Sequence, residues 1–382
     1  MITLRLNKGS SSRVLRGHPW IYSNELTRGG AGDIAAGTLV RILTADGRPV
    51  GVATYNPHSL IAARLLDRNP DALIDPDWIA ARLRRALHLR TRLIGSKFYR
   101  LIHAEADGLP GAIIDRFADV VVVQANSAGM DALAPELVAA LEQVLQPETI
   151  LIAGDDRARS LEGLPPRHDV VKGSLPDTLT VEENGRTYLA DLTHGQKTGW
   201  FFDHRANRAF IAGLARDRSV LDVYTYAGGF ALAAAAAGAR QVTAIDRAAP
   251  ALALAEKAAE GMGTAGRCSF VQGEAFAELE RRATDGERFE IVVADPPARA
   301  IASSPAFAPT SPRKTAFSPS PAAAIMCRPV TSPQRQRAAS GTRDGRRASS
   351  TVPAPMPTIR CIPCCRKAPI SNSWSTLWIE PR

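Results

Sequence analysis

The feature that most constrains the fold is a regular alternation of strand-like and helix-like segments between residues 186 and 298. Apolar runs at 219–225, 241–246, 269–274 and 289–297 alternate with alanine-rich, helix-like segments at 229–239, 249–262 and 275–283. Strands separated by helices pair in parallel, because a parallel pair needs a long crossover connection. This region therefore predicts a doubly wound α/β domain.

Two further blocks precede this domain. Residues 1–74 hold strand-like runs at 38–45, 49–56 and 60–67 between Gly, Asp and Pro turns, which predicts a small β-barrel-like module. The next block, 75–185, begins with an amphipathic basic helix at 75–94 and continues with strands within 112–126 and a helix at 130–145. We therefore predict a β module at 1–74, a middle α+β domain at 75–185 and the doubly wound domain at 186–298.

Composition changes abruptly after residue 298. Residues 299–382 carry 13 of the 47 basic residues but 2 of the 38 acidic ones, so the net charge of +9 belongs to this tail, and residues 1–298 are slightly acidic. The tail also holds 13 of the 27 prolines and four of the five cysteines, without strand or helix periodicity. We predict that it is disordered, either as a basic linker or because its coding sequence is read in a shifted frame.

A shifted frame can be tested on the sequence itself. With one choice of synonymous codons, the adjacent frame across 361–380 reads His-Pro-Leu-Leu-Pro-Glu-Ser-Ala-Tyr-Leu-Lys-Leu-Leu-Val-Tyr-Ala-Leu-Asp and then a stop. Residues 321–328 permit Ser-Cys-Ser-His-His-Val in the same way. A strand-like ending that closes on a stop codon favours the frameshift over the linker.

Polar residues follow the four strands of the doubly wound domain. Asp222 and Asp246 end the first two strands, and Glu274 and Asp295 follow the third and fourth. Because the carboxyl ends of parallel strands meet at one edge, these side chains are expected to line one crevice. The turn after Asp222 lacks the Gly-x-Gly-x-x-Gly spacing of NAD sites, which favours another nucleoside cofactor, with Asp246 accepting hydrogen bonds from its ribose.

These ordered motifs, at 222–230, 246, 273–276 and 294–298, resemble those of class I S-adenosylmethionine-dependent methyltransferases. The segments 6–26, 51–68, 105–117 and 194–208 resemble the PUA-containing large-subunit rRNA cytosine methyltransferases. The resemblance covers almost all of residues 1–298. It implies a PUA-like β-barrel, a middle α+β domain and a Rossmann-like methyltransferase sheet that is incomplete, with S-adenosylmethionine as cofactor and 23S rRNA as partner.

The resemblance also implies roles for individual residues. Asp222 and Gly228 would shape the methionine pocket, Asp246 would hold the ribose, and Glu274 stands where the family usually has an Asp near the adenine amino group. Gln196 would help to cover the cofactor, and His204 replaces the family's usual Gln. The full set implied to bind the cofactor is Lys197, Thr198, Phe202, Arg205, Asp222, Tyr224, Thr225, Gly228, Gly229, Phe230, Asp246, Arg247, Glu274, Ala275 and Asp295.

The implied reaction, methyl transfer to carbon 5 of a cytosine, needs a nucleophile that this chain lacks. Carbon 5 is unreactive until a thiolate adds to carbon 6, and a base must later remove the carbon-5 proton. Asp295 would be the catalytic acid facing the base. The family's nucleophilic Cys lies beyond the fourth strand, in the shifted stretch, and Cys327 is merely the out-of-frame neighbour of that position. The written chain is therefore expected to be inactive.

RNA binding is implied by the PUA resemblance rather than by net charge. Arg13, Arg16 and Arg64 are the candidate contacts. A second basic cluster fits a solvated helix face equally well and comprises Arg82, Arg84, Arg85, Arg90 and Arg92. No metal site or disulfide is expected, because the tail cysteines lack two spaced pairs and Cys268 suits a core position.

The whole sequence also bears on where the protein is located, on its oligomeric state and on alternative functions. It has no run of about 18 apolar residues and no apolar core of a signal peptide at its start, so we expect a soluble cytoplasmic protein. The oligomeric state is left open, with a homodimer among the alternatives. Two other functions remain open: an RNA guanine-N methyltransferase, which would use Asp-Pro-Pro without a Cys, and a non-catalytic fragment that binds RNA and cofactor.

Overall fold

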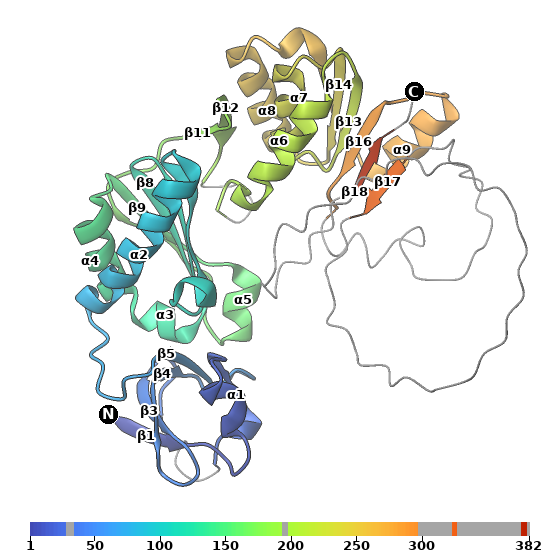
Figure 1. Cartoon of the computed structure of the whole chain (residues 1–382). Helices are drawn as coiled ribbons and strands as arrows, with labels where there is room; N and C mark the ends of the chain where they lie inside the picture. The colour runs from blue at the N-terminus through green and yellow to red at the C-terminus, as the bar shows by residue number, and fades with distance from the viewer. Residues whose placement is uncertain (28–33, 193–197, 297–322, 327–375, 380–382) are drawn as a thin grey trace, which may run out of the picture. The chain divides into compact units, whose positions relative to one another are not determined.

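The computed structural model describes residues 1–27, 34–192, 198–296, 323–326 and 376–379 (Figure 1). The chain divides into two compact units, Met1–Ala294 and Asp295–Arg382. The three regions predicted before the tail lie in the first unit, except for residues 295–298, which belong to the second unit. Among the described helices, none combines the length and the apolar character that a membrane span requires.

The N-terminal region is a five-stranded sheet in the order β1-β3-β4-β5-β2. Strand β1 pairs in parallel with β3, and the other pairs are antiparallel. Side chains alternate along β3, where Val40 and Ile42 are fully buried in the core of this region. The three expected strand runs are confirmed as β3–β5; the bounds are β1 Ile2–Arg5, α1 Ser11–Leu15, β2 Trp20–Ile21, β3 Leu39–Leu43, β4 Pro49–Tyr55 and β5 Ala63–Asp67.

Helix α2 (Pro76–Ile94) begins and ends where its sequence predicts. The Asp75 side chain accepts a hydrogen bond from the Trp78 backbone N–H at 2.8 Å, and Pro76 occupies the first helical position, where its missing N–H costs nothing. Gly95 ends the helix in the left-handed conformation, with φ of 62°. The buried face of α2 presents Ile79 and Leu83, whereas Arg84, Arg85 and Arg92 are exposed.

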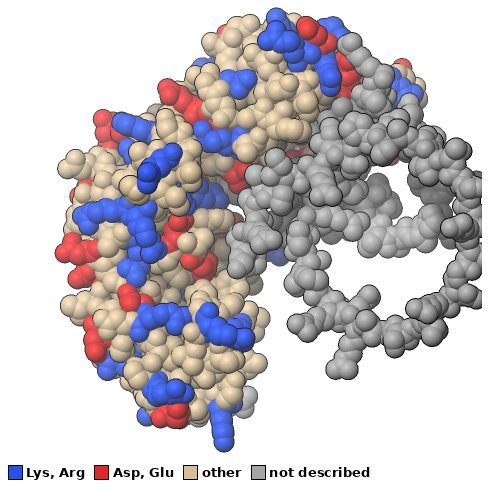
Figure 2. Space-filling model, viewed as in Figure 1, with Lys and Arg blue, Asp and Glu red and all other residues tan. Residues whose placement is uncertain are grey.

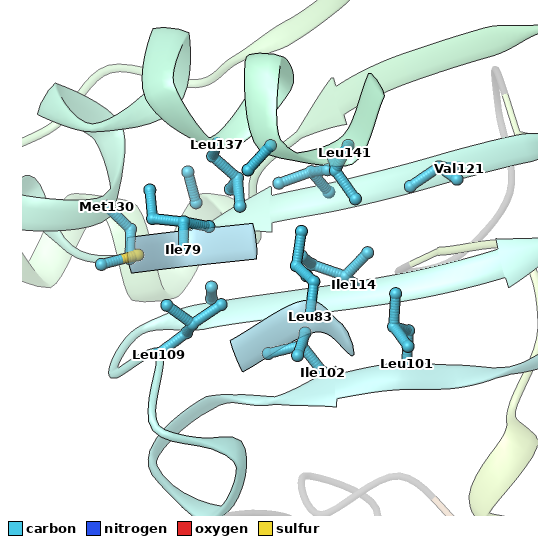
Figure 3. Packing of buried hydrophobic residues seen from close by; sticks show 14 of the residues in the cluster. Ile79, Leu83, Leu101, Ile102, Leu109, Ile114, Val121, Met130, Leu137 and Leu141 are labelled. Atoms are coloured by element: carbon cyan, nitrogen blue, oxygen red, sulfur yellow. The ribbon is translucent and has the colours of Figure 1, made fainter. Parts of the chain in front are cut away.

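The middle region is a five-stranded sheet in the order β10-β9-β8-β7-β6, parallel between β8 and β9 and otherwise antiparallel. Figure 3 shows Ile79 and Leu83 of α2 and Leu137 of α4 packed against the sheet, where Ile114 is also buried. The bounds are β6 Phe98–His103, β7 Ala112–Phe117, β8 Val120–Ala125, α3 Ala128–Ala132, α4 Ala134–Leu145, β9 Thr149–Ala153, α5 Asp156–Leu161 and β10 His168–Lys172.

The antiparallel hairpin β11 (Leu179–Glu183) and β12 (Arg186–Ala190) follows, and the predicted boundary at residue 185 falls in its turn. Leu179 and Val181 of β11 share a hydrophobic cluster with Phe117 of the middle sheet and with Leu232 of the next domain. The hairpin therefore packs against both α/β regions of the first unit.

The predicted doubly wound domain is confirmed. Its first-unit strands run β15-β14-β13-β16, all parallel, and Figure 1 shows α6, α7 and α8 on one face and α9 on the other. The bounds are α6 Arg205–Leu214, β13 Ser219–Val223, α7 Gly229–Ala236, β14 Gln241–Asp246, α8 Ala249–Gly261, β15 Cys268–Gln272, α9 Ala275–Thr284 and β16 Ile291–Ala294.

Helix α7 is unusual in being apolar around its whole circumference. Its sequence is GFALAAAA, and its first seven residues are all buried. A helix without a polar face must be enclosed on every side. Alanine suits a helix that is enclosed in this way, because it has the highest helix propensity and needs little volume.

The tail differs from expectation at two places. Strands β17 (Ala323–Met326) and β18 (Thr376–Ile379) pair antiparallel in the second unit, so the prediction of no regular structure is wrong for these eight residues. Thr376–Ile379 contains β-branched and aromatic residues, which suit a strand. The other residues of the tail lie outside the described residues.

Candidate cofactor site at the carboxyl ends of the parallel strands

The loop between β13 and α7 carries unusual backbone strain. Tyr224, Tyr226 and Gly228 all have left-handed backbones, with φ of 64°, 52° and 77°. For a residue with a side chain this conformation costs about 1–2 kcal/mol, and such strain persists only where the surroundings impose it. The Thr225 N–H donates to the Ile245 carbonyl at 3.0 Å, and the Gly228 N–H donates to the Thr225 carbonyl at 3.0 Å. The loop is therefore fastened to β14 in one shape.

Asp222 holds that loop in place through two hydrogen bonds. Its side chain is buried, and its Oδ2 accepts hydrogen bonds from the Thr225 hydroxyl at 2.5 Å and from the Ala231 N–H at 2.9 Å. One carboxylate oxygen thus joins the loop to the first turn of α7. The expected role of Asp222 in shaping the pocket stays a prediction, and this geometry is consistent with it.

Asp246 connects the same loop to the neighbouring strand. Its Oδ2 accepts from the Tyr226 N–H at 2.8 Å and its Oδ1 from the Ala248 N–H at 2.9 Å. Each carboxylate oxygen has two lone pairs, so Asp246 retains capacity to accept from a ligand hydroxyl. The side chain is half-buried and reaches the edge where the strands end.

Tyr224 marks the position where these groups meet. Burial raises the pKa of its phenol, the carboxylates of Glu274 and Asp246 raise it further, and Arg247 opposes them. Its hydroxyl is buried and has no hydrogen-bond partner among the described residues. A buried hydroxyl left in this way costs free energy that a bound ligand can recover. Tyr224, Asp246, Arg247 and Glu274 therefore act on one small region.

Glu274 performs a structural task as well. Its Oε2 accepts from the backbone N–H groups of Phe276 at 2.9 Å and Ala277 at 3.4 Å, so it caps α9, whose first residue is the buried Ala275. The side chain is otherwise exposed. The cap thus gives this acid a local structural role, and its contact with adenine stays a prediction.

Packing explains the two glycines. A Cβ on Gly228 would lie 2.8 Å from the Ala255 Cβ, and one on Gly229 would lie 3.3 Å from the Arg208 Cδ. Gly228 also requires its left-handed backbone. Phe230, the next residue, is buried and its ring lies 5.5 Å from the His204 ring in an edge-on contact. The start of α7 is therefore closely enclosed.

Three residues expected to cover the cofactor contact the middle domain in this structure. The Thr198 hydroxyl donates to Asp115 at 2.5 Å, the Phe202 ring lies 5.1 Å from Phe117, and Arg205 donates to the Phe98 carbonyl. Their contact with cofactor stays a prediction. Lys197 and Gln196 lie outside the described residues.

The sequence reasoning missed a buried ion pair behind the glycine loop. Arg208 donates to both oxygens of Glu183, at 2.6 and 2.9 Å, and both side chains are at most 3% exposed. The Arg208 guanidinium lies 4.6 Å from the centre of the Trp200 ring, and the Trp200 indole donates to Glu183 at 3.3 Å. The sequence signal that could have revealed this pair is the alternation along β11, which places Glu183 on the same buried face as Leu179 and Val181.

The remaining predicted residues are scattered. Asp295 follows β16 directly, at the carboxyl end of the sheet. Arg64 forms a salt bridge with Glu162 at 2.7 Å and is 12% exposed, which leaves little of it for RNA. Arg13 pairs with Glu25 at 2.6 Å, whereas Arg16 is exposed. The structure thus does not assemble the three arginines into one free basic surface.

Cys268 is half-buried at the start of β15, and burial raises the pKa of its thiol. It packs against the hydrophobic cluster of the domain, as predicted for a core cysteine. The described ranges contain no group of three or more His, Cys, Asp or Glu side chains that could hold a metal ion.

Comparison with known proteins identifies the family. Residues 4–68 match the PUA-like domain family, and residues 167–307 match the S-adenosylmethionine-dependent methyltransferases. The ribosomal RNA large subunit methyltransferase I of Cronobacter sakazakii is 37% identical over 302 residues, 78% of this chain and 76% of that protein. The chain belongs to this family. The Shewanella denitrificans member is 35% identical over 304 residues, with the same shares of both chains.

Solved structures agree on the fold. A proposed S-adenosylmethionine-dependent methyltransferase from Streptococcus mutans superposes with a TM-score of 0.66 at 21% identity, covering 76% of each chain. A second, complexed with SAH, gives a TM-score of 0.68 at 21% identity and covers 78% of this chain and 77% of that one. The mixed fold, with PUA-like strands and a Rossmann-like sheet, is thereby confirmed.

Membership makes this chain a class I methyltransferase that uses S-adenosylmethionine. The described residues fit this cofactor. An unpartnered Tyr224 hydroxyl, an acid after β14 and a glycine that excludes a side chain meet at one edge of the sheet. When bound, the cofactor supplies an electrophilic methyl group on a positively charged sulfur, which suits an edge lined by carboxylates.

Proposed function

We propose that this chain derives from an enzyme that methylates carbon 5 of a cytosine in 23S rRNA, and that its sequence from residue 299 onward is read in a shifted frame. The observation that carries the proposal is where similarity stops. The methyltransferase match ends at residue 307, soon after composition changes, and the Cronobacter sakazakii relative matches 78% of this chain and not all of it.

Within this proposal the site residues divide by task. Asp246 accepts hydrogen bonds from the ribose, Glu274 lies toward the adenine, and Asp222 and Gly228 hold the loop against the methionine part. The two amide hydrogen bonds to Asp246 support its role, because they orient the carboxylate before any ligand arrives. Arg208 and Glu183 support the loop from behind, through the contact with Gly229.

The proposed chemistry determines what the written chain lacks. A thiolate adds to carbon 6 of the base, carbon 5 then takes the methyl group, and a base removes the carbon-5 proton so that the thiolate can leave. Asp295, directly after β16, is the proposed acid at the ring. The residue that would supply the thiolate is missing, so the 382-residue chain is proposed to bind cofactor and rRNA in the cytoplasm without methylating.

Repairing the frame tests this proposal. DNA sequencing between the codons for Asp295 and Ser311 locates the shift, and a frame-corrected gene supplies the comparison protein. Incubation with unmodified 23S rRNA and nucleoside analysis should show 5-methylcytosine for the corrected protein and none for the 382-residue chain. Replacing the restored Cys by Ala should abolish the product.

Each outcome separates the alternatives. Formation of 5-methylcytosine by the 382-residue chain would refute the missing nucleophile. Methylated guanine from the corrected protein would instead support the guanine-N methyltransferase. A corrected protein that binds cofactor and RNA but forms no methylated nucleoside would support the non-catalytic reading.

A further inference from the structure

A pocket lies where the PUA-like sheet meets helix α2, away from the cofactor site. It has a volume of about 330 Å³ and is lined by Gly17, Asp67, Arg68, Arg82, Arg85 and Gly108, together with apolar residues. Its three arginines come from the end of β5 and from α2. The pocket is open to solvent and lies within the first unit of the chain.

The charges around this pocket do not balance. Asp67 accepts from Arg82 at 3.0 Å and from the Trp78 indole at 2.7 Å, so it neutralises one guanidinium. Arg68 donates to the Val14 carbonyl at 3.0 Å, and Arg85 donates to the Asp107 carbonyl at 3.3 Å. In the described part of the chain, no carboxylate lies within salt-bridge distance of Arg68 or Arg85. Two positive charges therefore remain.

Arg82 and Arg85 are also close enough to repel. Burial lowers the pKa of Arg82, Asp67 raises it, and the charge of Arg85 lowers it again. Arg82 is held rigidly, because its guanidinium also lies 3.2 Å from the centre of the Trp78 ring. Repulsion between fixed like charges is relieved by an anion bound between them.

Glycines lie beside two of the arginines. A Cβ on Gly108 would lie 3.2 Å from an Arg85 terminal nitrogen, and one on Gly17 would lie 3.9 Å from an Arg68 terminal nitrogen. Both glycines have left-handed backbones, with φ of 77° and 114°. The guanidinium groups thus lie against bare backbone, and most of their N–H donors remain available to a ligand.

We propose that this junction pocket binds a backbone phosphate of an RNA through Arg68 and Arg85, with Arg82 held in place by Asp67 and Trp78. A phosphate has the charge and the several acceptor oxygens that paired guanidinium groups recognise. Figure 2 shows Lys and Arg side chains where α2 lies, so the test of the pocket needs a control arginine on the same helix that does not line it. The inference rests on the proposed rRNA substrate but not on the nucleophile or on the methylated position.

Anisotropy of a fluorescein-labelled RNA hairpin tests this pocket in the 382-residue chain. The decisive variant is Arg85→Gln, and its matched control is Arg84→Gln, which removes the same charge from an exposed neighbour on α2 that does not line the pocket. We expect Arg85→Gln to weaken binding and to lower the slope of log Kd against log salt by about 0.7–0.9, the loss of one phosphate contact. Arg84→Gln should change neither, and Arg85→Lys should keep the slope.

Other results would overturn the proposal. Equal slopes for Arg85→Gln and Arg84→Gln, with matching melting temperatures, would show that the pocket holds no RNA phosphate. Calorimetry with inorganic phosphate identifies the other source: heat that Arg85→Gln removes, without any change in RNA binding, would make this a free-anion site. Absence of RNA binding by the wild-type chain would also refute it. Because no methyl transfer is measured, these results are independent of the cytosine proposal.

Discussion

Asp115 in the middle domain and Asp222 in the methyltransferase domain are both buried strand carboxylates, yet different groups stabilise them. Asp115 receives two hydrogen bonds from the Arg100 guanidinium, at 2.9 and 3.0 Å. Asp222 receives one from the Thr225 hydroxyl and one from the Ala231 N–H. Asp115 thus has a guanidinium beside it in addition to the Thr198 hydroxyl, whereas the hydroxyl and the amide that donate to Asp222 come from the loop and helix that follow it in the chain.

The same division extends to other acids. Asp107 pairs with Arg90, Glu162 with Arg64 and Glu183 with Arg208, and each of these pairs fastens one segment of the chain to another. Asp246 and Glu274 accept backbone N–H groups instead. We infer that the arginine-paired acids serve the fold, whereas Asp246, which two amide N–H groups orient, keeps lone pairs for a ligand.

The largest expected effect concerns the arginine-paired acids. Glu183→Ala leaves Arg208 buried and without its carboxylate, which should lower the free energy of unfolding by about 3–5 kcal/mol. Urea denaturation followed by tryptophan fluorescence measures it. The double variant Glu183→Leu with Arg208→Met should recover most of the loss, since no charge is then left alone. A single variant that loses less than about 1 kcal/mol would break the comparison.

A smaller loss of folding stability is expected at low pH. Burial by itself would raise the pKa of Glu162, but hydrogen bonds from Arg64, Asn56 and Ser59 bring it below the ordinary value of 4.5. A carboxyl group with a lowered folded pKa stabilises the fold above its unfolded pKa, and that stability disappears as pH falls through the folded value. The stability difference between the wild type and Glu162→Gln should therefore be constant above pH 4.5 and shrink below it. A difference independent of pH would contradict this.

Replacing the acid that accepts backbone N–H groups at the cofactor edge should lower the affinity for the cofactor. Asp246→Ala should weaken S-adenosylmethionine binding by about 1–3 kcal/mol, because the ribose loses a charged acceptor and the loop loses its anchor at Tyr226. Isothermal calorimetry on the 382-residue chain measures this, with Glu162→Gln as the control that should leave cofactor affinity nearly unchanged, because Glu162 pairs with Arg64 and not with a residue of the cofactor edge. Identical affinities for wild type and Asp246→Ala would remove Asp246 from the site.

The smallest effect is expected at Tyr224. Tyr224→Phe removes a buried hydroxyl that lacks a partner, so the free chain should become more stable by up to about 1 kcal/mol. If the cofactor uses that hydroxyl, affinity should fall in the same variant. Thermal melts with and without S-adenosylmethionine separate the two effects, and a lower melting temperature of the free chain would show that the hydroxyl already has a partner.

Local patterns explain how far the sequence could be interpreted. Apolar strand runs alternating with helix-like segments predicted β13, β14, β15 and β16, and the amphipathic pattern of residues 75–94 predicted α2, because both patterns depend on residues that are close in the sequence. The strand-end acids were predicted for the same reason. The Glu183–Arg208 pair was not, since these residues are 25 positions apart and meet only after the hairpin and α6 pack together.

The same limit explains the basic residues. From the sequence, Arg64 is as good a candidate for RNA contact as Arg85, because both are arginines near a turn or on a polar helix face. The difference lies in Glu162, which is 98 positions from Arg64 and occupies its guanidinium. Counting charges along a chain cannot show which of them the fold has already neutralised.

Helix α7 has a consequence for how this domain tolerates change. Its alanines look like the least informative stretch of the sequence, but its first seven residues are enclosed on all sides. Each added methylene group must therefore displace a neighbour, and such overpacking typically costs about 1–3 kcal/mol. Since the Ala231 N–H also holds Asp222, any displacement of the helix would reach the cofactor loop. Helix α7 thus acts as a spacer, because the small volume of its side chains sets the position of the cofactor loop. Substitutions by larger residues are therefore expected to be poorly tolerated in this helix.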